Sequence, residues 1–395
     1  MFTCIYCNKK KDDKEATLEH IFPKSLGGAL LNNDIYKTHD VCEVCNRNMG
    51  LWVDGVFIKS WLVNNLKAMS YNKFIDLDKG TPVPLSYMGQ IDELSVDGFT
   101  CDYWLGIAGE SVFHIHECAD DKFNTYVGGN VILKKTKPGT VYYIANEINE
   151  AWYRTCLISV VTHFKEQRRI FVNGRIDNDE KEEFFNIPNE IETKTANKLL
   201  EYKKKIDESD DKIRCTVRML EGFEHRILAK LAIGLGYNII GKEYLKSKNY
   251  KQMLKMLWSK TMKDRKDLQI HGSDFSHVIG KNAPFDLLFG EDRVSILIFH
   301  DGDELALVLD FWRKLTFSIK IIDSTLDDNL LSSPISNSTL TYLFEPIGKS
   351  IGPITLTDAI LHYTKKQIIP ELDVIDKSTP NPNPLPPRNK SQNID

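Results

Sequence analysis

The first forty-five residues of this chain hold two Cys-x2-Cys pairs, and no other feature limits its folding as strongly. The pairs are Cys4 with Cys7 and Cys42 with Cys45. Each pair places two thiolates on one side of an ion, so together they offer the four tetrahedral ligands of a structural zinc site. Residues 1–52 are turn-rich and polar, with too few large apolar side chains for a core of their own. We therefore expect zinc binding to supply their folding free energy.

The start of the chain and its overall charge indicate the compartment and the kind of partner. Residues 1–4 lack the basic and apolar regions of a signal peptide, and no run approaches the roughly eighteen apolar residues of a membrane span. We expect a cytoplasmic protein with no membrane partner, where reduced cysteine pairs indicate metal rather than disulfides. The net charge of −4 excludes a uniformly basic nucleic-acid binder, so contact with nucleic acid has to come from local patches.

The segment between the two cysteine pairs is longer than a simple zinc finger needs. It contains Glu19-His20-Ile21-Phe22-Pro23, a Gly27-Gly28 pair and Asn32-Asn33, and Asn46 directly follows the second pair. In this order, these elements resemble the HNH endonuclease family, in the subgroup whose ββα-metal fold is held by a Cys4 zinc. The resemblance covers about an eighth of the chain and combines several independent motifs.

The residue types in this segment suit phosphodiester hydrolysis, which needs a base for water and a cation for the leaving oxygen. His20 is the predicted base, because the pKa of an imidazole lies close to working pH. Glu19 and Asn46 offer the hard oxygen ligands that Mg²⁺ or Mn²⁺ prefers. The resemblance implies that Asn33 orients His20 or its backbone, and that Asn46 fills the last metal-binding position.

Two departures from the family pattern affect these roles. Glu19 stands where the family more often has Asp, so its carboxylate reaches one methylene farther. The stretch from Asn33 to Cys42 is also longer than usual, which leaves Asn32, Asn33 and His39 as competitors for the middle role.

The rest of the chain predicts a mixed α+β region. A helix is expected over 53–68, short strands over 81–147, a helix over 149–166 and further helices over 190–262. A second group of strands follows at 293–322. The predicted fold class is therefore α+β, with a zinc-stabilised ββα-metal module at the N-terminus. The expected domains are the nuclease module at 1–68, an α+β regulatory or specificity region at 69–372 that can hold two subdomains, and a disordered tail at 373–395.

Two further clusters allow more than one interpretation. His114, His116 and Cys118 alternate along a predicted strand, with Cys101 nearby, and a partly exposed sheet face is favoured over a second zinc site. Residues 242–266 are rich in lysine, with Tyr244, Tyr250 and Trp258 between the cations. A helix with a buried apolar side is slightly favoured there over contact with DNA. Lys9-Lys10-Lys11 is the more plausible phosphate contact, since it adjoins the first cysteine pair.

We expect an HNH-type endonuclease that hydrolyses DNA, with structural Zn²⁺ and catalytic Mg²⁺ or Mn²⁺, acting in restriction or phage defence. RNA is not excluded as a substrate, and the larger region is expected to bind a regulatory ligand or a partner protein. The alternative is a non-catalytic zinc module that binds nucleic acid or protein. The sequence leaves the oligomeric state, the target and the activating signal open.

Overall fold

The computed structural model describes the chain apart from residues 32–33, 96–97, 118–138, 146–147, 166–168, 174–189, 210–211, 218, 220–221, 260–287, 302–303, 327–339, 345–349 and 378–395. Two compact units emerge from its contacts. Unit 1 consists of Met1–Ser60 and Glu221–Pro380, and unit 2 consists of Trp61–Leu220 and Asn381–Asp395. The N-terminal sixty residues, called the N-terminal module below, therefore share a unit with the C-terminal part of the chain.

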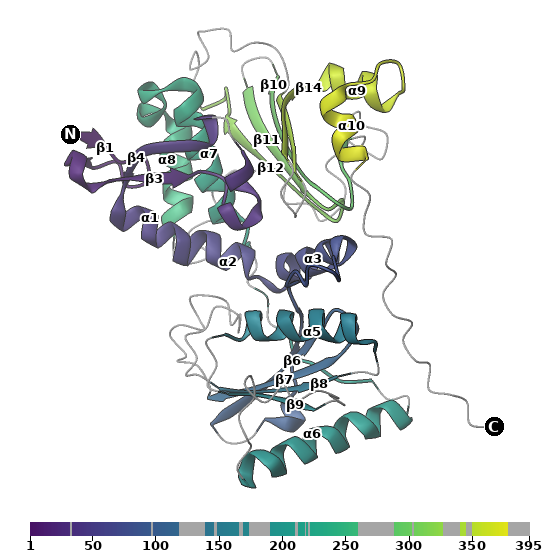
Figure 1. The fold of residues 1–395 in the computed structure, drawn as a ribbon. Helices are drawn as coiled ribbons and strands as arrows, with labels where there is room; N and C mark the ends of the chain where they lie inside the picture. Colours follow the sequence, from purple (N-terminus) through teal and green to yellow (C-terminus); the bar gives the residue numbers. More distant parts are fainter. Residues whose placement is uncertain are drawn as a thin grey trace. The chain divides into compact units, whose positions relative to one another are not determined.

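The N-terminal module has the ββα order that its sequence predicts (Figure 1). Strand β3 (Ala16–His20) pairs antiparallel with β4 (Lys37–Cys42), and helix α1 (Glu43–Met49) follows β4 directly. A shorter antiparallel pair, β1 (Phe2–Thr3) and β2 (Lys10–Lys11), flanks the turn that carries Cys4 and Cys7. Both cysteine pairs thus lie at the ends of short strands.

The helix that leaves the module is interrupted. After α1 the backbone widens into a π-helical turn at Gly50–Asp54, continues as α2 (Gly55–Ile58) and ends at Ser60, whose hydroxyl donates to the Phe57 carbonyl at 2.7 Å. Helix α3 (Trp61–Tyr71) then begins in unit 2. The single helix predicted over 53–68 is therefore divided at Ser60, the last residue of the first segment of unit 1. π-turns of this kind are frequent at functional sites.

Two helices from the C-terminal part of unit 1 cover the module. Helix α7 (His225–Ile240) is buried along its whole length from Arg226 to Gly236, and α8 (Lys248–Trp258) follows after a 3-10 turn. Tyr250 Oη donates to the Ile5 carbonyl at 2.9 Å, and Trp258 Nε1 donates to the Tyr6 carbonyl at 2.6 Å. The core that the module lacks on its own is thus completed by residues more than two hundred positions away.

Five antiparallel strands complete unit 1, in the order β12-β11-β10-β13-β14. Strand β10 lies in the middle and pairs with β11 on one side and β13 on the other. Two short helices follow the last strand. The bounds are β10 (Val294–Asp301), β11 (Glu304–Phe311), β12 (Leu315–Ile322), β13 (Leu340–Phe344), β14 (Ser350–Thr355), α9 (Leu356–Tyr363) and α10 (Pro370–Asp376).

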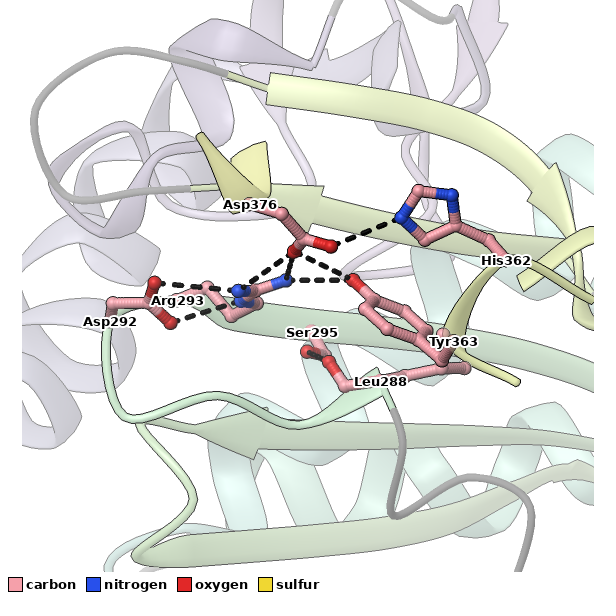
Figure 2. Close-up of polar contacts among 7 residues, drawn as sticks. All are labelled: Leu288, Asp292, Arg293, Ser295, His362, Tyr363 and Asp376. Carbon is pink, nitrogen blue, oxygen red and sulfur yellow. Dashed lines mark hydrogen bonds and ion pairs between the residues drawn. The ribbon is translucent and has the colours of Figure 1, made fainter. Parts of the chain in front are cut away.

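A polar network joins the two last helices to the start of β10 (Figure 2). Arg293 donates to Tyr363 Oη at 2.9 Å and approaches Asp376 Oδ1 at 3.4 Å, while its Nε donates to Asp292 at 3.0 Å. His362 Nε2 lies 3.0 Å from the other oxygen of Asp376. The Arg293 guanidinium is shared between the carboxylates of Asp292 and Asp376, and these charge-assisted bonds stabilise the position of both short helices.

Unit 2 is built on a second five-stranded sheet, in the order β5-β6-β7-β8-β9. The first three pairings are antiparallel, and β8 pairs with β9 in parallel because α5 crosses over between them. A core that includes residues of α5 covers one face of the sheet, and a core that includes residues of α6 covers the other. The bounds are β5 (Ser86–Gln90), β6 (Phe99–Leu105), β7 (Ser111–Glu117), β8 (Thr140–Ile144), α5 (Glu150–His163), β9 (Arg169–Asn173) and α6 (Glu190–Ser209).

The observed elements confirm the predicted α+β class. The strands expected near 99–109, 111–118, 140–146 and 293–322 are present, as is the helix expected over 149–166. Residues 118–138 of the predicted strand region and residues 378–395 of the tail predicted over 373–395 lie outside the described residues, whereas residues 373–376 of that tail belong to helix α10. None of the helices in the described part of the chain combines the length and apolar character that a membrane span requires.

A first prediction concerns the contact of α7 with the module. A Cβ atom at Gly234 would lie 2.7 Å from Cγ1 and Cγ2 of Ile21, a stiff and fully buried side chain. We expect Gly234→Ala to lower the free energy of unfolding by about 1–2 kcal/mol, since the clash outweighs the gain in helix propensity. Urea denaturation measures it.

Gly50→Ala is the matched control. Gly50 has helical backbone angles, and a Cβ placed there would meet no described atom within 4 Å beyond its chain neighbours and the backbone of its own helix. This variant should be as stable as the wild type or slightly more stable. Equal denaturation midpoints for Gly234→Ala and Gly50→Ala would show that α7 does not press on Ile21.

Candidate nuclease site

The four paired cysteines converge as the sequence predicts. One Sγ atom from each of Cys4, Cys7, Cys42 and Cys45 lies within 4.8 Å of all the others. Four sulfurs around one zinc ion are roughly 3.8 Å apart, given Zn–S bonds of about 2.3 Å, so the cluster fits a tetrahedral ion after small adjustment. The structure therefore shows a possible zinc site.

The surroundings of the cluster favour thiolate ligands. The backbone N–H of Cys42 points at Cys4 Sγ at 3.4 Å, and hydrogen bonding, first of all from Cys45, lowers the pKa of Cys4 to about 5. All but Cys7 are buried, and Cys7 is partly exposed. A metal needs the deprotonated form, so an acidic cysteine supplies a first ligand at neutral pH.

His20 is the last residue of β3, where the strand opens onto a cavity of about 520 Å³. Glu19, Asn46 and Asp54 line the same cavity, together with Lys24 and Lys59. Burial lowers the pKa of His20, and the positive charges of Lys24, Lys37 and Lys230 lower it further. Its imidazole is therefore neutral at pH 7 and able to accept a proton.

Glu19 is held by a lysine that the sequence did not point to. Lys230 of α7 has no exposed surface, and its Nζ lies 2.7 Å from Glu19 Oε1. The same Nζ lies 2.9 and 2.8 Å from the two carboxylate oxygens of Asp54 and donates to the His20 carbonyl at 3.3 Å. We call Glu19, Asp54 and Lys230 the Lys230 triad.

Lys230 and each carboxyl group of the Lys230 triad shift one another's pKa. Burial alone would lower the pKa of Lys230, but the charges and hydrogen bonds of Asp54 and Glu19 raise it above its ordinary value. Burial raises the pKa of both carboxyl groups, and Lys230 opposes that rise in each. The ammonium form of Lys230 is thus favoured, and the two carboxyl groups share it.

Asn46 lies in α1, one residue after the last cysteine of the cluster. Its side-chain nitrogen donates to Thr17 Oγ1 at 3.0 Å and to the Leu18 carbonyl at 3.2 Å. These two bonds fix the amide, and the oxygen is the side-chain atom left to bind a cation. Asn33, the residue predicted to orient His20, and its competitor Asn32 lie outside the described residues.

A catalytic cation fits this cavity only if it shares Glu19 with Lys230. Among the described residues, Glu19, His20 and Asp54 do not form a group of three ligand atoms within 4.8 Å of one another. Asn46 fits the predicted role of metal ligand better than Glu19 does. Both hydrogen bonds that orient its amide use the nitrogen and leave the oxygen for a cation. Mg²⁺ needs few protein ligands, because it usually keeps several waters and binds substrate phosphate as well.

Comparison with known proteins agrees with this geometry in one region of the chain. The family model described as HNH endonuclease matches residues 4–62. These residues form an HNH module. The match includes both cysteine pairs, Glu19, His20, Asn46 and Asp54, and it supports a nuclease-type function that acts on nucleic acid. No curated protein and no solved structure matches the chain.

Sequence reasoning missed two residues of the Lys230 triad, Asp54 and Lys230. Asp54 lies eight positions after Asn46 on the same helical run, so its spacing was a usable signal. Lys230 carried almost none, because it lies in one of the helices expected over 190–262 with apolar residues such as Ile227 and Leu231 around it. A lysine within so apolar a helix is the only hint that it has a buried partner.

The lysine-rich segment after α7 is confirmed as a helix with a buried apolar side over its described part, residues 242–259. Tyr244 and Tyr250 are fully buried, so these rings do not stack on bases. The lysines at 242, 246, 248, 251 and 255 are exposed. Lys10, Lys242 and Lys246 line a second cavity of unit 1, of about 690 Å³. Contact of these lysines with phosphate stays a prediction.

A second prediction concerns zinc. Cys42→Ser removes one of the four thiolates, so the protein should lose one zinc ion per chain relative to the wild type, measured by elemental analysis of purified protein. Limited proteolysis should then cut residues 1–60 first. Cys215→Ser, a partly exposed cysteine of unit 2, is the control and should keep the wild-type zinc content. An unchanged zinc content in Cys42→Ser would contradict the assignment.

A third prediction concerns the Lys230 triad. Lys230→Met leaves the buried Glu19 and the partly buried Asp54 without their cation, and we expect a loss of about 3–5 kcal/mol in the free energy of unfolding. Lys246 pairs with Glu243 at 2.7 Å on the surface, with both side chains about 70% exposed. Lys246→Met should therefore change stability by less than about 1 kcal/mol. Similar losses in the two variants would show that the triad adds no more than a surface pair.

Proposed function

We propose that the HNH module is the catalytic centre of a metal-dependent endonuclease that hydrolyses phosphodiester bonds in DNA. The observation that carries the proposal is His20, a neutral imidazole at the end of β3 on the wall of a cavity large enough for a phosphodiester group. His20 accepts a proton from the attacking water. RNA is an alternative substrate, because lysine and histidine contacts to phosphate are the same for both nucleic acids.

The cation is proposed to bind at Asn46, with Glu19 shared between it and Lys230. A bound Mg²⁺ or Mn²⁺ stabilises the charge on the leaving oxygen. The zinc is proposed to have a different task, since four cysteine ligands leave no open position for a substrate. Asn33 keeps its proposed role of orienting His20 or its backbone.

Positive side chains around the cavity support a substrate with phosphate groups. Lys24 and Lys59 line it beside His20, in a chain whose net charge is −4. Lysine acts on phosphate as a point charge and contributes the sequence-independent part of nucleic-acid binding. Local attraction of this kind is what a protein of negative net charge needs in order to bind DNA.

A non-catalytic binding module is the second candidate, and one observation favours it. Lys230 already neutralises much of the Glu19 charge, so an ion at the cavity is held less strongly than at a free carboxylate. In that case the module would bind nucleic acid or protein without cutting. The two functions differ in whether His20 and a divalent cation are needed for cleavage.

The setting of the nuclease is also a proposal. We propose that the protein acts in the cytoplasm in restriction or phage defence, and that residues 69–372 respond to a regulatory ligand or a partner protein. The packing of α7 and α8 on the module supports control from the rest of the chain. A movement of α7 would alter the Lys230 triad directly.

A plasmid assay tests the central proposal. Wild-type protein with Mg²⁺ or Mn²⁺ should convert supercoiled plasmid to nicked or linear DNA, and a chelator should prevent it. His20→Ala should reduce cleavage by about two to four orders of magnitude while DNA binding, measured by gel shift, stays unchanged. His300→Ala, which changes a partly exposed histidine of β10, is the matched control and should cleave like the wild type. Cleavage by His20→Ala at the wild-type rate would exclude this base.

A fourth prediction concerns pH. Because the pKa of His20 is lowered from its ordinary value of 6.5, the active neutral form persists below that pH. Protonation of His20 should not limit the cleavage rate near pH 7. The rate should fall only as the pH drops below 6.5 and His20 becomes protonated. A pH–rate profile under single-turnover conditions measures this. Loss of activity with a midpoint above 6.5 would mean that another group is the base.

A further inference from the structure

Three potential metal ligands meet in unit 2, away from the HNH module in the sequence. Asp102 of β6 is the direct antiparallel partner of His114 in β7, and His116 follows two residues later on the same face of the sheet. One ligand atom from each of the three lies within 4.8 Å of the other two. The pairing register therefore gathers two imidazoles and a carboxylate without any contribution from a loop.

The three side chains are buried, with exposed fractions of 2% for Asp102, 6% for His114 and 1% for His116. The partly exposed sheet face favoured from the sequence is thus wrong for these residues, which share the face covered by α5 with Trp104 and Val112. Cys101 belongs to the core on the opposite face, and Cys118 lies outside the described residues. Ionisable groups in such a core require a compensating partner.

Hydrogen bonds orient two of the three groups as metal ligands are oriented. His116 Nδ1 lies 2.9 Å from the Glu117 carbonyl, which can only accept, so Nδ1 carries the proton and Nε2 faces Asp102. Tyr87 Oη donates to Asp102 Oδ1 at 3.2 Å. A second ring nitrogen bonded to a backbone carbonyl, and a hydrogen-bonded carboxylate, are the usual outer partners of histidine and aspartate ligands.

Space next to the histidines is kept open by Gly139, just before β8. A Cβ atom there would lie 2.3 Å from the Ile115 carbonyl oxygen, 2.8 Å from His116 Cβ and 2.9 Å from His114 Nε2. Any other residue at this position would press on the backbone of β7 and on His114 Nε2. Glycine at this position therefore lets the chain pass close to β7 and leaves His114 Nε2 uncovered on that side.

We propose that Asp102, His114 and His116 bind a divalent transition-metal ion, with Zn²⁺ as the ion that suits two imidazoles and one carboxylate. In the metal-free state a proton lies between His116 Nε2 and Asp102 Oδ2, which are 2.6 Å apart. Metal binding releases that proton to solvent. Two ligands of one tetrahedral zinc are roughly 3.3 Å apart, so the two atoms separate by about 0.7 Å from their present 2.6 Å. The ion joins β6 to β7 inside unit 2.

Counting zinc in the full-length protein tests this site. His116→Gln keeps a polar side chain but removes the ligand nitrogen, and it should hold one zinc ion per chain fewer than the wild type, by elemental analysis after dialysis against trace zinc. His362→Gln is the matched control, because His362 also pairs with a single aspartate but has no second histidine in that network. It should keep the wild-type content. An equal zinc content in His116→Gln and wild type overturns the proposal.

Zinc content can also be measured on treated wild-type protein, which avoids the risk that a variant does not fold. The reagent p-hydroxymercuribenzoate binds thiolates and releases zinc from cysteine sites, whereas a site of histidine and aspartate is not attacked. We expect treated protein to keep one zinc ion per chain. Complete loss of zinc on treatment overturns the proposal. The result does not depend on nuclease activity.

Discussion

The ammonium of Lys230, enclosed between the carboxylates of Glu19 and Asp54, is the interaction on which the rest of unit 1 depends. It joins the end of β3 to the π-turn after α1 and to the middle of α7, three elements that are far apart in sequence. An unpaired charge at any of these positions would be costly, because removing one member of a buried ion group leaves the others uncompensated. The triad therefore fixes the module and the C-terminal helices in one arrangement.

This arrangement defines how the candidate site can work. Glu19 cannot act as an independent metal ligand while Lys230 contacts it, so Asn46 and substrate phosphate have a larger share in binding a cation. The same contact places the His20 carbonyl next to a fixed positive charge and leaves the imidazole at the cavity wall. Preorganisation of this kind is what catalytic groups need, since they must be held close to their productive geometry.

Sequence analysis predicted the parts of the molecule that depend on local pattern. The Cys-x2-Cys spacing predicted the cysteine cluster, and the order of Glu19-His20, Asn46 and the second pair predicted the ββα module. Apolar runs predicted β5 to β8 and β10 to β12, whereas β9, β13 and β14 were not predicted from the sequence. What it could not predict was pairing between distant segments. Lys230 meets Glu19 across 211 positions, and Asp102 meets His114 and His116 only because the register of β6 and β7 aligns them.

Contacts between distant segments also explain why the sequence predicted only part of what stabilises the N-terminal module. Residues 1–52 were predicted to lack a core of their own; in the structure their apolar residues Ile5, Tyr6 and Ile21 are buried. Tyr250, Trp258 and the buried helix α7 contact this module from the C-terminal part of the chain. Zinc is therefore not the only contribution to the folding of this module. A family match limited to residues 4–62 likewise gives no information about the helices that complete it.

If α7 completes the proposed nuclease centre through Lys230, removing the ammonium should slow cleavage without unfolding the protein. Single-turnover cleavage of a labelled DNA duplex by wild type and Lys230→Met, with zinc content and circular dichroism measured in both, measures this effect. We expect the wild type to cleave with Mg²⁺ or Mn²⁺, and the variant to keep its zinc and its helices but to cleave about a hundredfold more slowly, because His20 and Glu19 are misplaced. Equal rates in the two folded proteins, or no cleavage by the wild type with either cation, would contradict it.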